Sequence, residues 1–365
     1  MIHRILALLS LVVLGFQVVA ADWPTFRGDP LQTGIASDKL PDKLEVLWTF
    51  ETKDAVEATA AIVNGVVYVG SYDEHLYALD LANGKEKWKF KAGPIKAAVG
   101  VRGGLVYVGN IDGDFFCVEA DTGKEKWRYK TEGEISSGAN FAGDNVLFGS
   151  GDEHLYCLSA AGKLVWKYKV PGGPVNGSPA IVGDRTFAAG CDSMLHVIDL
   201  KQGKQLAKVE LGGQVGASAA VHGDRVYVGT MSSNQVLAID WKKAEIAWQF
   251  EAPKAANAFF ASPAVTEQLV LAGSRDRRIW AIDRKTGKEA WSFPTDKHVN
   301  SSPVVSGDKV YGASLDGKLY VLDLAKGTLL QDLKLGAELS ASPAIGGGRL
   351  VIGTEKGLVY CLGKK

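Results

Sequence analysis

The sequence predicts an all-β protein assembled from eight similar units, and three observations carry that prediction. A hydrophobic strand ending in glycine recurs with gaps of 39, 40, 41, 39, 44, 39 and 41 residues, at Gly70, Gly109, Gly149, Gly190, Gly229, Gly273, Gly312 and Gly353. Each unit holds short strands separated by Gly, Asp and Asn turns, and the last unit lacks its fourth strand. Because a repeat of about 40 residues with four strands is typical of a propeller blade, we predict an eight-bladed β-propeller of four-stranded antiparallel blades.

The first unit shows how residue types predict each strand. Residues 58–63, 66–69, 75–80 and 86–91 are short runs rich in β-branched and aromatic side chains. Asn64 and Gly65 join the first two runs and accept the positive φ of a tight hairpin. The third run ends at Asp80, whose side chain can bond the backbone two residues further on and start a turn. These periodic residues are predicted to build blades, and we assign no site to them.

A tryptophan occupies the fourth strand of most units. The residues concerned are Trp48, Trp88, Trp127, Trp166, Trp248 and Trp291. So large an aromatic side chain on a blade's outer strand is expected to pack against a neighbouring blade. The fourth and seventh units break the rule with Ala207 and Gln331.

The two ends of the chain are predicted to close the ring together. The last unit stops at Lys365 after three strands, and residues 44–50 form a strand-like run that precedes the first unit and carries Trp48. Pairing this N-terminal strand with the C-terminal repeat completes the eighth blade. It also leaves no open sheet edge, which is the liability that propellers avoid.

The first twenty residues are typical of a secretory signal peptide. Arg4 gives a basic start, and an apolar run reaches Ala20, shorter than the roughly 20 residues that span a bilayer. The small residues that follow predict cleavage after Ala20 or Ala21, and no cysteine there offers a lipoprotein anchor. We expect a signal peptide at 1–20, a lead-in segment at 21–43 and the propeller at 44–363. The location is then periplasmic or extracellular, with no membrane span after cleavage.

Charge and cysteine usage narrow the classes of function. The 41 basic and 41 acidic residues balance, which does not favour nucleic acid as a partner. Cys117, Cys157 and Cys361 share one slot that Ala78 fills in the first unit, so they are predicted to be buried free thiols. Cys191 lies in a turn, and the absence of a Cys-x-x-Cys pair disfavours zinc. We predict no metal site and no catalytic residue.

Two runs of the repeat, and the segment before them, carry a family resemblance. LYALD at 76–80 with GKEKW at 84–88, and IWAIDRKTGKEAW at 279–291, resemble the repeat of the pyrroloquinoline-quinone-like (PQQ-like) β-propeller family. The resemblance covers residues 44–363. DWPTFRGD at 22–29 also resembles the lead-in segment of many exported members.

The resemblance implies one of two kinds of function. Quinoprotein dehydrogenases hold the quinone, usually with calcium, at the centre of the ring, and in the alcohol type a pair of adjacent cysteines stacks on the cofactor. The non-catalytic BamB-like branch binds proteins. No two cysteines are adjacent here, and no nucleophile, base and orienting group stand at informative spacing. We therefore favour the BamB-like branch, with no cofactor.

One face of the ring is predicted to carry the binding residues. The turns between second and third strands are acidic in the first three blades, whereas the sixth has Arg275, Arg277 and Arg278. The sixth blade also has a longer leading segment, 252–260, and aromatic residues with arginine are typical of interface hot spots. The alternative is a phenylalanine pair in the core and arginines that favour solubility. The predicted binding residues are Phe259, Phe260, Arg275, Arg277, Arg278, Lys297 and His298.

The expected function is an exported, non-catalytic binding scaffold. Its partner is expected to be a protein of the cell envelope, bound by a monomeric ring. Two alternatives stay open. One is a PQQ-dependent oxidoreductase that uses PQQ and calcium, and the other is a propeller that binds a sugar or peptide in its channel.

Overall fold

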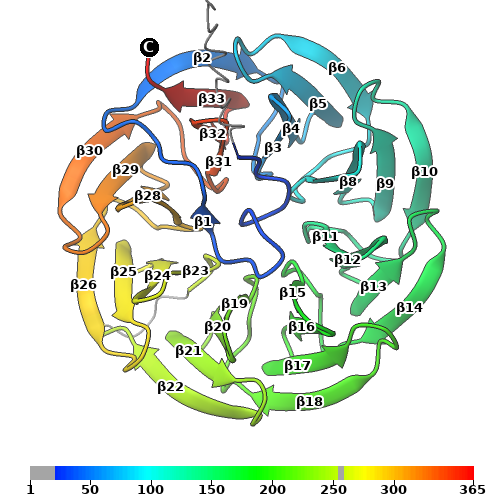
Figure 1. The fold of residues 1–365 in the computed structure, drawn as a ribbon, viewed down its shortest axis with the longest axis vertical. Helices are drawn as coiled ribbons and strands as arrows, with labels where there is room; N and C mark the ends of the chain where they lie inside the picture. The colour runs from blue at the N-terminus through cyan, green and yellow to red at the C-terminus, as the bar shows by residue number, and fades with distance from the viewer. Residues whose placement is uncertain (1–20, 254–258) are drawn as a thin grey trace, which may run out of the picture.

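The computed structural model describes residues 21–253 and 259–365, so the predicted signal peptide at 1–20 lies outside the described residues. The described strands form eight sheets arranged around a central axis (Figure 1). The predicted eight-bladed, all-β propeller is therefore confirmed. Within the described ranges, no helix is long and apolar enough to cross a membrane.

Each blade is a meander of four antiparallel strands, numbered outward from the axis. Blades one to four are β3 (Ala61–Val63), β4 (Val66–Gly70), β5 (His75–Asp80), β6 (Glu86–Lys91); β7 (Gly100–Arg102), β8 (Leu105–Gly109), β9 (Asp114–Glu119), β10 (Glu125–Lys130); β11 (Asn140–Ala142), β12 (Asn145–Gly149), β13 (His154–Leu158), β14 (Leu164–Lys169); β15 (Ala180–Val182), β16 (Arg185–Ala189), β17 (Met194–Asp199), β18 (Gln205–Glu210). Blades five to eight are β19 (Ala220–His222), β20 (Arg225–Gly229), β21 (Gln235–Asp240), β22 (Glu245–Glu251); β23 (Ala264–Val265), β24 (Leu269–Ser274), β25 (Arg278–Asp283), β26 (Glu289–Pro294); β27 (Val304–Ser306), β28 (Lys309–Ala313), β29 (Lys318–Asp323), β30 (Leu329–Lys334); β31 (Ala344–Gly346), β32 (Arg349–Gly353), β33 (Leu358–Gly363) and β2 (Glu45–Glu51).

The innermost strand of the first blade begins later than predicted, at Ala61 instead of residue 58. The residues before it bond to the next blade and not to β4. The Thr59 carbonyl accepts a hydrogen bond of 3.2 Å from Val99 N, so this stretch links two blades.

The glycine that marks the repeat is required by packing between blades. A side chain added at Gly229 would place its Cβ 2.6 Å from Phe259 Cβ, and one at Gly273 would lie 2.6 Å from Val299 Cγ1. Phe259 and Val299 belong to the segments that lead into the next blade. The repeated glycine therefore lets each blade receive an apolar residue of its neighbour.

The tryptophans join each blade to the following one. Trp48 Nε1 donates to the Leu81 carbonyl of blade one at 2.8 Å, and its ring covers Gly84, where a Cβ would lie 2.7 Å from Cδ2. Gly84 has φ +74°, so this turn favours glycine for its backbone as well as for space. Equivalent indole bonds to the next blade are made by Trp88, Trp127, Trp166, Trp248 and Trp291.

Both exceptions to the tryptophan rule have a structural reason. Where Ala207 replaces the tryptophan, the next turn carries Ala244 instead of glycine, and both pack with Trp241 in one hydrophobic cluster. Gln331 faces the junction of the two chain ends. Its amide accepts from Leu44 N at 2.9 Å and donates to Leu44 O at 2.8 Å.

Closure of the ring follows the predicted pairing. Strand β2 is antiparallel to β33, with Glu45 opposite Gly363 and Glu51 opposite Leu358. The eighth blade therefore takes one strand from the N-terminal side and three from the C-terminal end. In Figure 1, the blue β2 lies outside the red β33.

The lead-in segment crosses the channel and bonds to every blade. Backbone N–H groups of Val101, Ile181, Val221, Val265, Val305 and Gly347 donate to its carbonyls, and Asn140 adds a side-chain donor. Trp23 exchanges two backbone hydrogen bonds with Ile62 of blade one, and β1 (Ile35–Ala36) runs parallel to β27. Figure 1 shows this dark-blue segment across the centre of the ring. It forms a floor within the channel.

The four cysteines are free, and three of them are buried. Burial raises the pKa of the Cys117 and Cys361 thiols to about 11 and that of Cys157 to about 12. These three thiols stay protonated at neutral pH, which agrees with a packing role.

Candidate functional site

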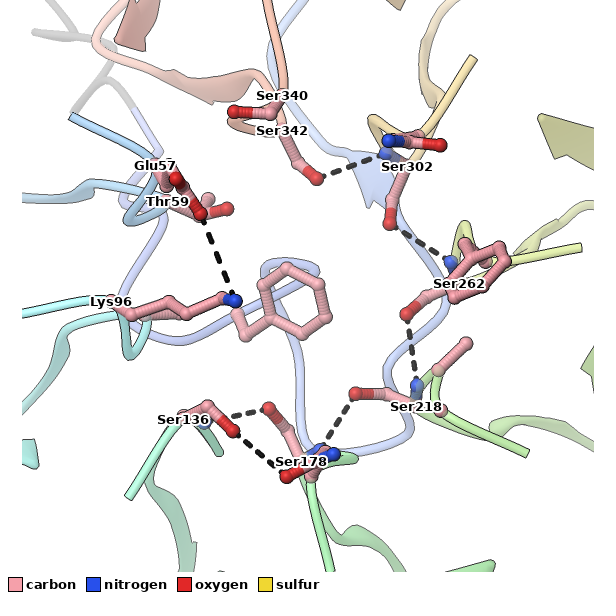
Figure 2. A pocket seen from close by; sticks show the side chains of 18 of the residues that line it. Glu57, Thr59, Lys96, Ser136, Ser178, Ser218, Ser262, Ser302, Ser340 and Ser342 are labelled. Atoms are coloured by element: carbon pink, nitrogen blue, oxygen red, sulfur yellow. Dashed lines mark hydrogen bonds and ion pairs between the residues drawn. The ribbon is translucent and has the colours of Figure 1, made fainter. Parts of the chain in front are cut away.

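A cup of about 430 Å³ opens at the channel mouth, on the face where the blade-joining segments lie. One position of each joining segment forms its wall, and in blades four to eight that position is serine. A backbone N–H of the preceding blade donates to each serine hydroxyl at 2.7–3.0 Å, as Figure 2 shows. The wall positions are Thr59, Ala98, Gly138, Ser178, Ser218, Ser262, Ser302 and Ser342.

The serine wall is rich in hydrogen-bond donors. A hydroxyl oxygen that accepts one hydrogen bond still has its own proton to donate. Among the described residues, these five hydroxyl protons meet no acceptor, and the side chains line the cup. The wall over blades four to eight therefore favours a ligand that carries acceptor oxygens.

The floor of the cup comes from the lead-in segment. Phe26 lines the cup, and the neighbouring Arg27 is buried, with 1% of its surface exposed. Arg27 donates to the Ser302 and Pro303 carbonyls of blade seven. Burial lowers the pKa of Arg27 to about 9, so the guanidinium is still charged at neutral pH. Its role is to fix the floor to the far side of the ring.

The rim of the cup carries opposite charges on opposite sides. On the side of blades one to three, Lys96 Nζ lies 3.8 Å from Glu57 Oε2. Burial, together with Glu57 and Glu134, raises the pKa of Tyr72 to about 12. On blade six, the Arg275 guanidinium stacks 3.7 Å from the Phe260 ring centre, and its Nε donates to Asn300 Oδ1 at 3.1 Å. A bound molecule would meet an acidic arc on one side and a fixed arginine on the other.

A second hollow, of about 850 Å³, lies outside the cup at blades six and seven. Five of the seven predicted binding residues line it: Arg275, Arg277, Arg278, Lys297 and His298. Within the described ranges, no carboxylate approaches the three arginines to salt-bridge distance, whereas Lys297 Nζ is 2.7 Å from Glu338 Oε1. Arg278 Nη1 donates to Ser292 Oγ at 2.9 Å, and its guanidinium lies over the Trp280 ring. The structure therefore brings five of the predicted residues together on one hollow, whose lining also includes Asp276, Glu289 and Asp296.

The two predicted phenylalanines are separated by the structure. Phe260 lines the cup beside Arg275. Phe259 is fully buried between blades five and six, so its assignment to a binding surface was wrong. Successive side chains of an extended backbone point in opposite directions, which sends Phe259 to the core and Phe260 to the channel.

Sequence reasoning missed the serine wall and the floor. The sequence does contain a signal for the wall: a Ser-Pro pair, preceded by an apolar or small residue, recurs with its serine at 178, 262, 302 and 342. The lead-in segment offered no comparable signal, since it has no repeat of its own. Its eight-blade course becomes visible only in three dimensions.

The fold and these surfaces define an eight-bladed β-propeller with a floored cup and an arginine-lined hollow on one face. A family profile described as "Beta-alanine-activating enzyme, beta-propeller" matches residues 94–364, well over half of the chain. The chain belongs to this family of PQQ-like β-propeller repeats.

Relatives and solved structures agree on the propeller and differ in function. The outer membrane protein assembly factor BamB of Burkholderia pseudomallei (strain K96243) is 27% identical over 151 residues, 40% of this chain and 38% of BamB. The beta-alanine-activating enzyme of Danio rerio is 37% identical over 91 residues, 23% of this chain and 8% of that enzyme. The chain thus spans less than two thirds of either relative.

Two solved structures show the same fold. BamB from Moraxella catarrhalis superimposes with a TM-score of 0.74 at 18% identity, covering 88% of this chain and 98% of that one. A europium-containing methanol dehydrogenase superimposes with a TM-score of 0.79 at 13% identity, covering 94% and 98%. At these identities, the likeness describes the fold alone.

The residues of the cup do not fit the calcium that accompanies the quinone in one branch of the family. Calcium takes six to eight oxygen ligands, usually including carboxylates. In the part of the chain that the structure describes, no three His, Cys, Asp or Glu side chains converge on a metal position. Glu57 is engaged by Lys96, and this lysine is the cup's cation on that side. We therefore derive no step through this cofactor.

Proposed function

We propose that the protein is a non-catalytic binding scaffold that captures an acidic segment of a partner protein in the hollow of blades six and seven. The observation that carries the proposal is the set of three arginines on one turn, none paired with a carboxylate among the described residues. Arginine binds carboxylates through two parallel N–H donors. Asp276 of the same turn forms no salt bridge with the three arginines, so an extended acidic segment would supply the carboxylates that pair with them.

Two of the arginines are held in place before a partner arrives. Arg275 is fixed by Phe260 and Asn300, and Arg278 by Ser292 with Trp280. A guanidinium that is already ordered loses less side-chain entropy on binding. Arg277 is exposed and free to follow the partner.

The location proposed for this activity is the cell envelope. The apolar start of the chain supports export, and the BamB relative is named as an outer membrane protein assembly factor. The monomeric ring would then bind a protein partner in the periplasm or outside the cell.

The experiment changes Arg275, Arg277 and Arg278 together to Ala and measures binding of a polyglutamate peptide and recovery of cross-linked envelope proteins. We expect peptide affinity to fall at least about tenfold, because interface arginines are frequent hot spots. The matched control is Lys85, Lys87 and Lys89 changed to Ala, which removes the same charge from exposed positions on the outer strand of blade one and directly before it. Equal losses in both variants, or none in either, would contradict the proposal.

A second candidate function is the binding of a small anion in the cup. The five free serine protons and Arg275 favour it. Addition of citrate, glutamate or inorganic phosphate should then raise the melting temperature, since a ligand at 100 times its Kd stabilises the folded state by about 2.7 kcal/mol. Arg275→Ala should abolish this shift and Arg277→Ala should not, because Arg275 lines the cup whereas Arg277 lines only the hollow. A parallel sample with PQQ and calcium tests the oxidoreductase alternative.

A further inference from the structure

The amino-terminal boundary of the described chain is bonded to Asp38 and to blade eight. The sequence leaves two cleavage positions open, after Ala20 and after Ala21. Ala21 N donates to Asp38 Oδ1 at 3.0 Å, and the Ala21 carbonyl accepts from Gly347 N at 3.0 Å. Cleavage after Ala21 would remove both interactions, whereas cleavage after Ala20 would keep them.

We propose that the chain is processed between Ala20 and Ala21 and that Asp38 receives the new amino terminus. The inference rests on the predicted export signal and is independent of any ligand. In the reaction, a signal peptidase of the export machinery hydrolyses the Ala20–Ala21 peptide bond. Water adds its hydroxyl to the Ala20 carbonyl carbon and a proton to the Ala21 nitrogen, which leaves a carboxylate and an amine.

The new amine changes the strength of the contact with Asp38. A terminal amino group has an ordinary pKa near 8 and is therefore mostly charged at neutral pH. The bond from the uncharged amide N–H to the Asp38 carboxylate is already charge-assisted, and it then becomes an ammonium–carboxylate pair in which donor and acceptor are both charged. The other oxygen of Asp38, Oδ2, accepts from Gly348 N at 2.9 Å, so the carboxylate is already oriented.

The pair fastens both ends of the channel floor to one blade. Ala21 and Asp38 lie near the two ends of the lead-in segment, and Gly347 with Gly348 forms the turn between β31 and β32 of blade eight. Blade eight is also the blade closed by strands from both ends of the chain. Processing therefore completes a clamp at the seam of the ring.

The first experiment exports the full chain in a bacterial host and determines the amino terminus of the mature protein by intact mass and terminal sequencing. We expect the mature chain to begin at Ala21. A terminus at Asp22, at any other residue, or an uncleaved chain would overturn the inference.

The second experiment measures the clamp itself by thermal unfolding. Asp38→Asn is compared in the processed protein and in a chain that carries Gly-Ser before Ala21, where the nitrogen is an amide. We expect the melting temperature to fall about 2 °C further in the processed protein. Asp22→Asn is the control, because Asp22 Oδ1 accepts from Asn64 N and does not contact the Ala21 nitrogen. Equal effects of Asp38→Asn in both chains would overturn the assigned role of Asp38.

Discussion

The same turn is built in two ways in this ring, by blades one and three and by blade six. In blade one, Asp73 accepts hydrogen bonds from the Tyr77 hydroxyl at 2.6 Å and from Lys53 N at 3.0 Å. In blade three, Asp152 accepts from Tyr156 and Glu132 N in the same manner. In blade six, Trp280 Nε1 donates to Asp276 at 3.0 Å, and the buried Oδ1 makes no hydrogen bond of normal geometry with the described residues.

Two backbone donors distinguish the two versions. One is the N–H two residues after the aspartate, which His75 donates to Asp73 at 3.1 Å and His154 donates to Asp152 at 3.2 Å. The other donor lies two residues after the end of the preceding blade's fourth strand, and it is Lys53 N for blade one and Glu132 N for blade three. In blade six, Pro253 holds that position and has no N–H to give. At all three aspartates, burial by itself disfavours the ionised carboxylate and raises its pKa. In Asp73 and Asp152 the hydrogen bonds outweigh it and lower the pKa, whereas in Asp276 burial prevails and raises the pKa.

The difference teaches where this protein departs from a pure scaffold. In blades one and three, the aspartate of the turn accepts hydrogen bonds from neighbouring groups and so stabilises the ring. Blade six leaves its aspartate with fewer hydrogen bonds and carries three arginines in or beside the same turn, of which Arg277 is exposed.

The largest effect is expected for the tryptophans, which lie on the face of the ring opposite to the aspartate turns. Trp248 Nε1 bonds to Arg284 O at 3.0 Å, much as Trp127 Nε1 bonds to Ala160 O at 2.9 Å. Trp127→Ala and Trp248→Ala should each lower the free energy of unfolding by about 3 kcal/mol, because both remove a large packed ring. Thermal and urea unfolding measure this loss. A much smaller cost at Trp248 would show that the irregularity of blade six extends through the whole blade.

The second prediction compares the aspartates directly. Asp152→Ala should cost about 2 kcal/mol, because it leaves the Tyr156 hydroxyl and two backbone N–H groups, of Glu132 and His154, without their acceptor. Asp276→Ala should cost about 1 kcal/mol or less, since it leaves only the Trp280 N–H. The same unfolding measurements decide this. Equal costs would mean that the missing backbone donors have no energetic consequence.

The third prediction concerns pH and has opposite signs at the two sites. The lowered pKa of Asp152 contributes stability that is present above the unfolded value of 3.8 and is lost as the pH falls through the lower folded value. The raised pKa of Asp276 destabilises the ionised protein, and this penalty disappears as the pH falls through the folded value toward 3.8. From pH 7 to 4, wild type should therefore gain stability relative to Asp276→Asn but not relative to Asp152→Asn. Melting temperatures across this range test the sign, and parallel curves for both variants would contradict it.

The smallest effect is expected for Pro253→Ala, which restores a backbone N–H. The new donor should bond Asp276 and contribute about 0.5–1 kcal/mol, part of which is offset by the greater freedom of the unfolded chain. The clearest readout is the pH dependence of the melting temperature, because the variant should no longer gain the stability that ionised Asp276 withholds from wild type until the pH falls. Pro24→Ala serves as the control for loss of a proline elsewhere. A pH profile identical to that of wild type would reject Pro253 as the cause.

Much of the fold was predictable because its information is local. The glycine spacing gave the number of blades, and the orphan strand before the first unit gave the closure. Most of the hollow was also predictable, since Arg275, Arg277 and Arg278 share one turn. Phe259 was misplaced because two adjacent phenylalanines look alike in sequence, and only the packing against Gly229 separates them.

The sequence alone determined the eight blades, their order and the strand that completes the ring, because hydrogen bonds between neighbouring strands and an apolar period repeat within each unit. The tertiary structure decided which residues meet. It brought Arg275 beside Phe260 and Asn300, lined the cup with serines from five blades, and carried the lead-in segment past all eight. It also set Ala21 against Asp38 and the Gly347–Gly348 turn. These contacts join segments with no common period, so their physical cause is the closure of the ring and not any local pattern.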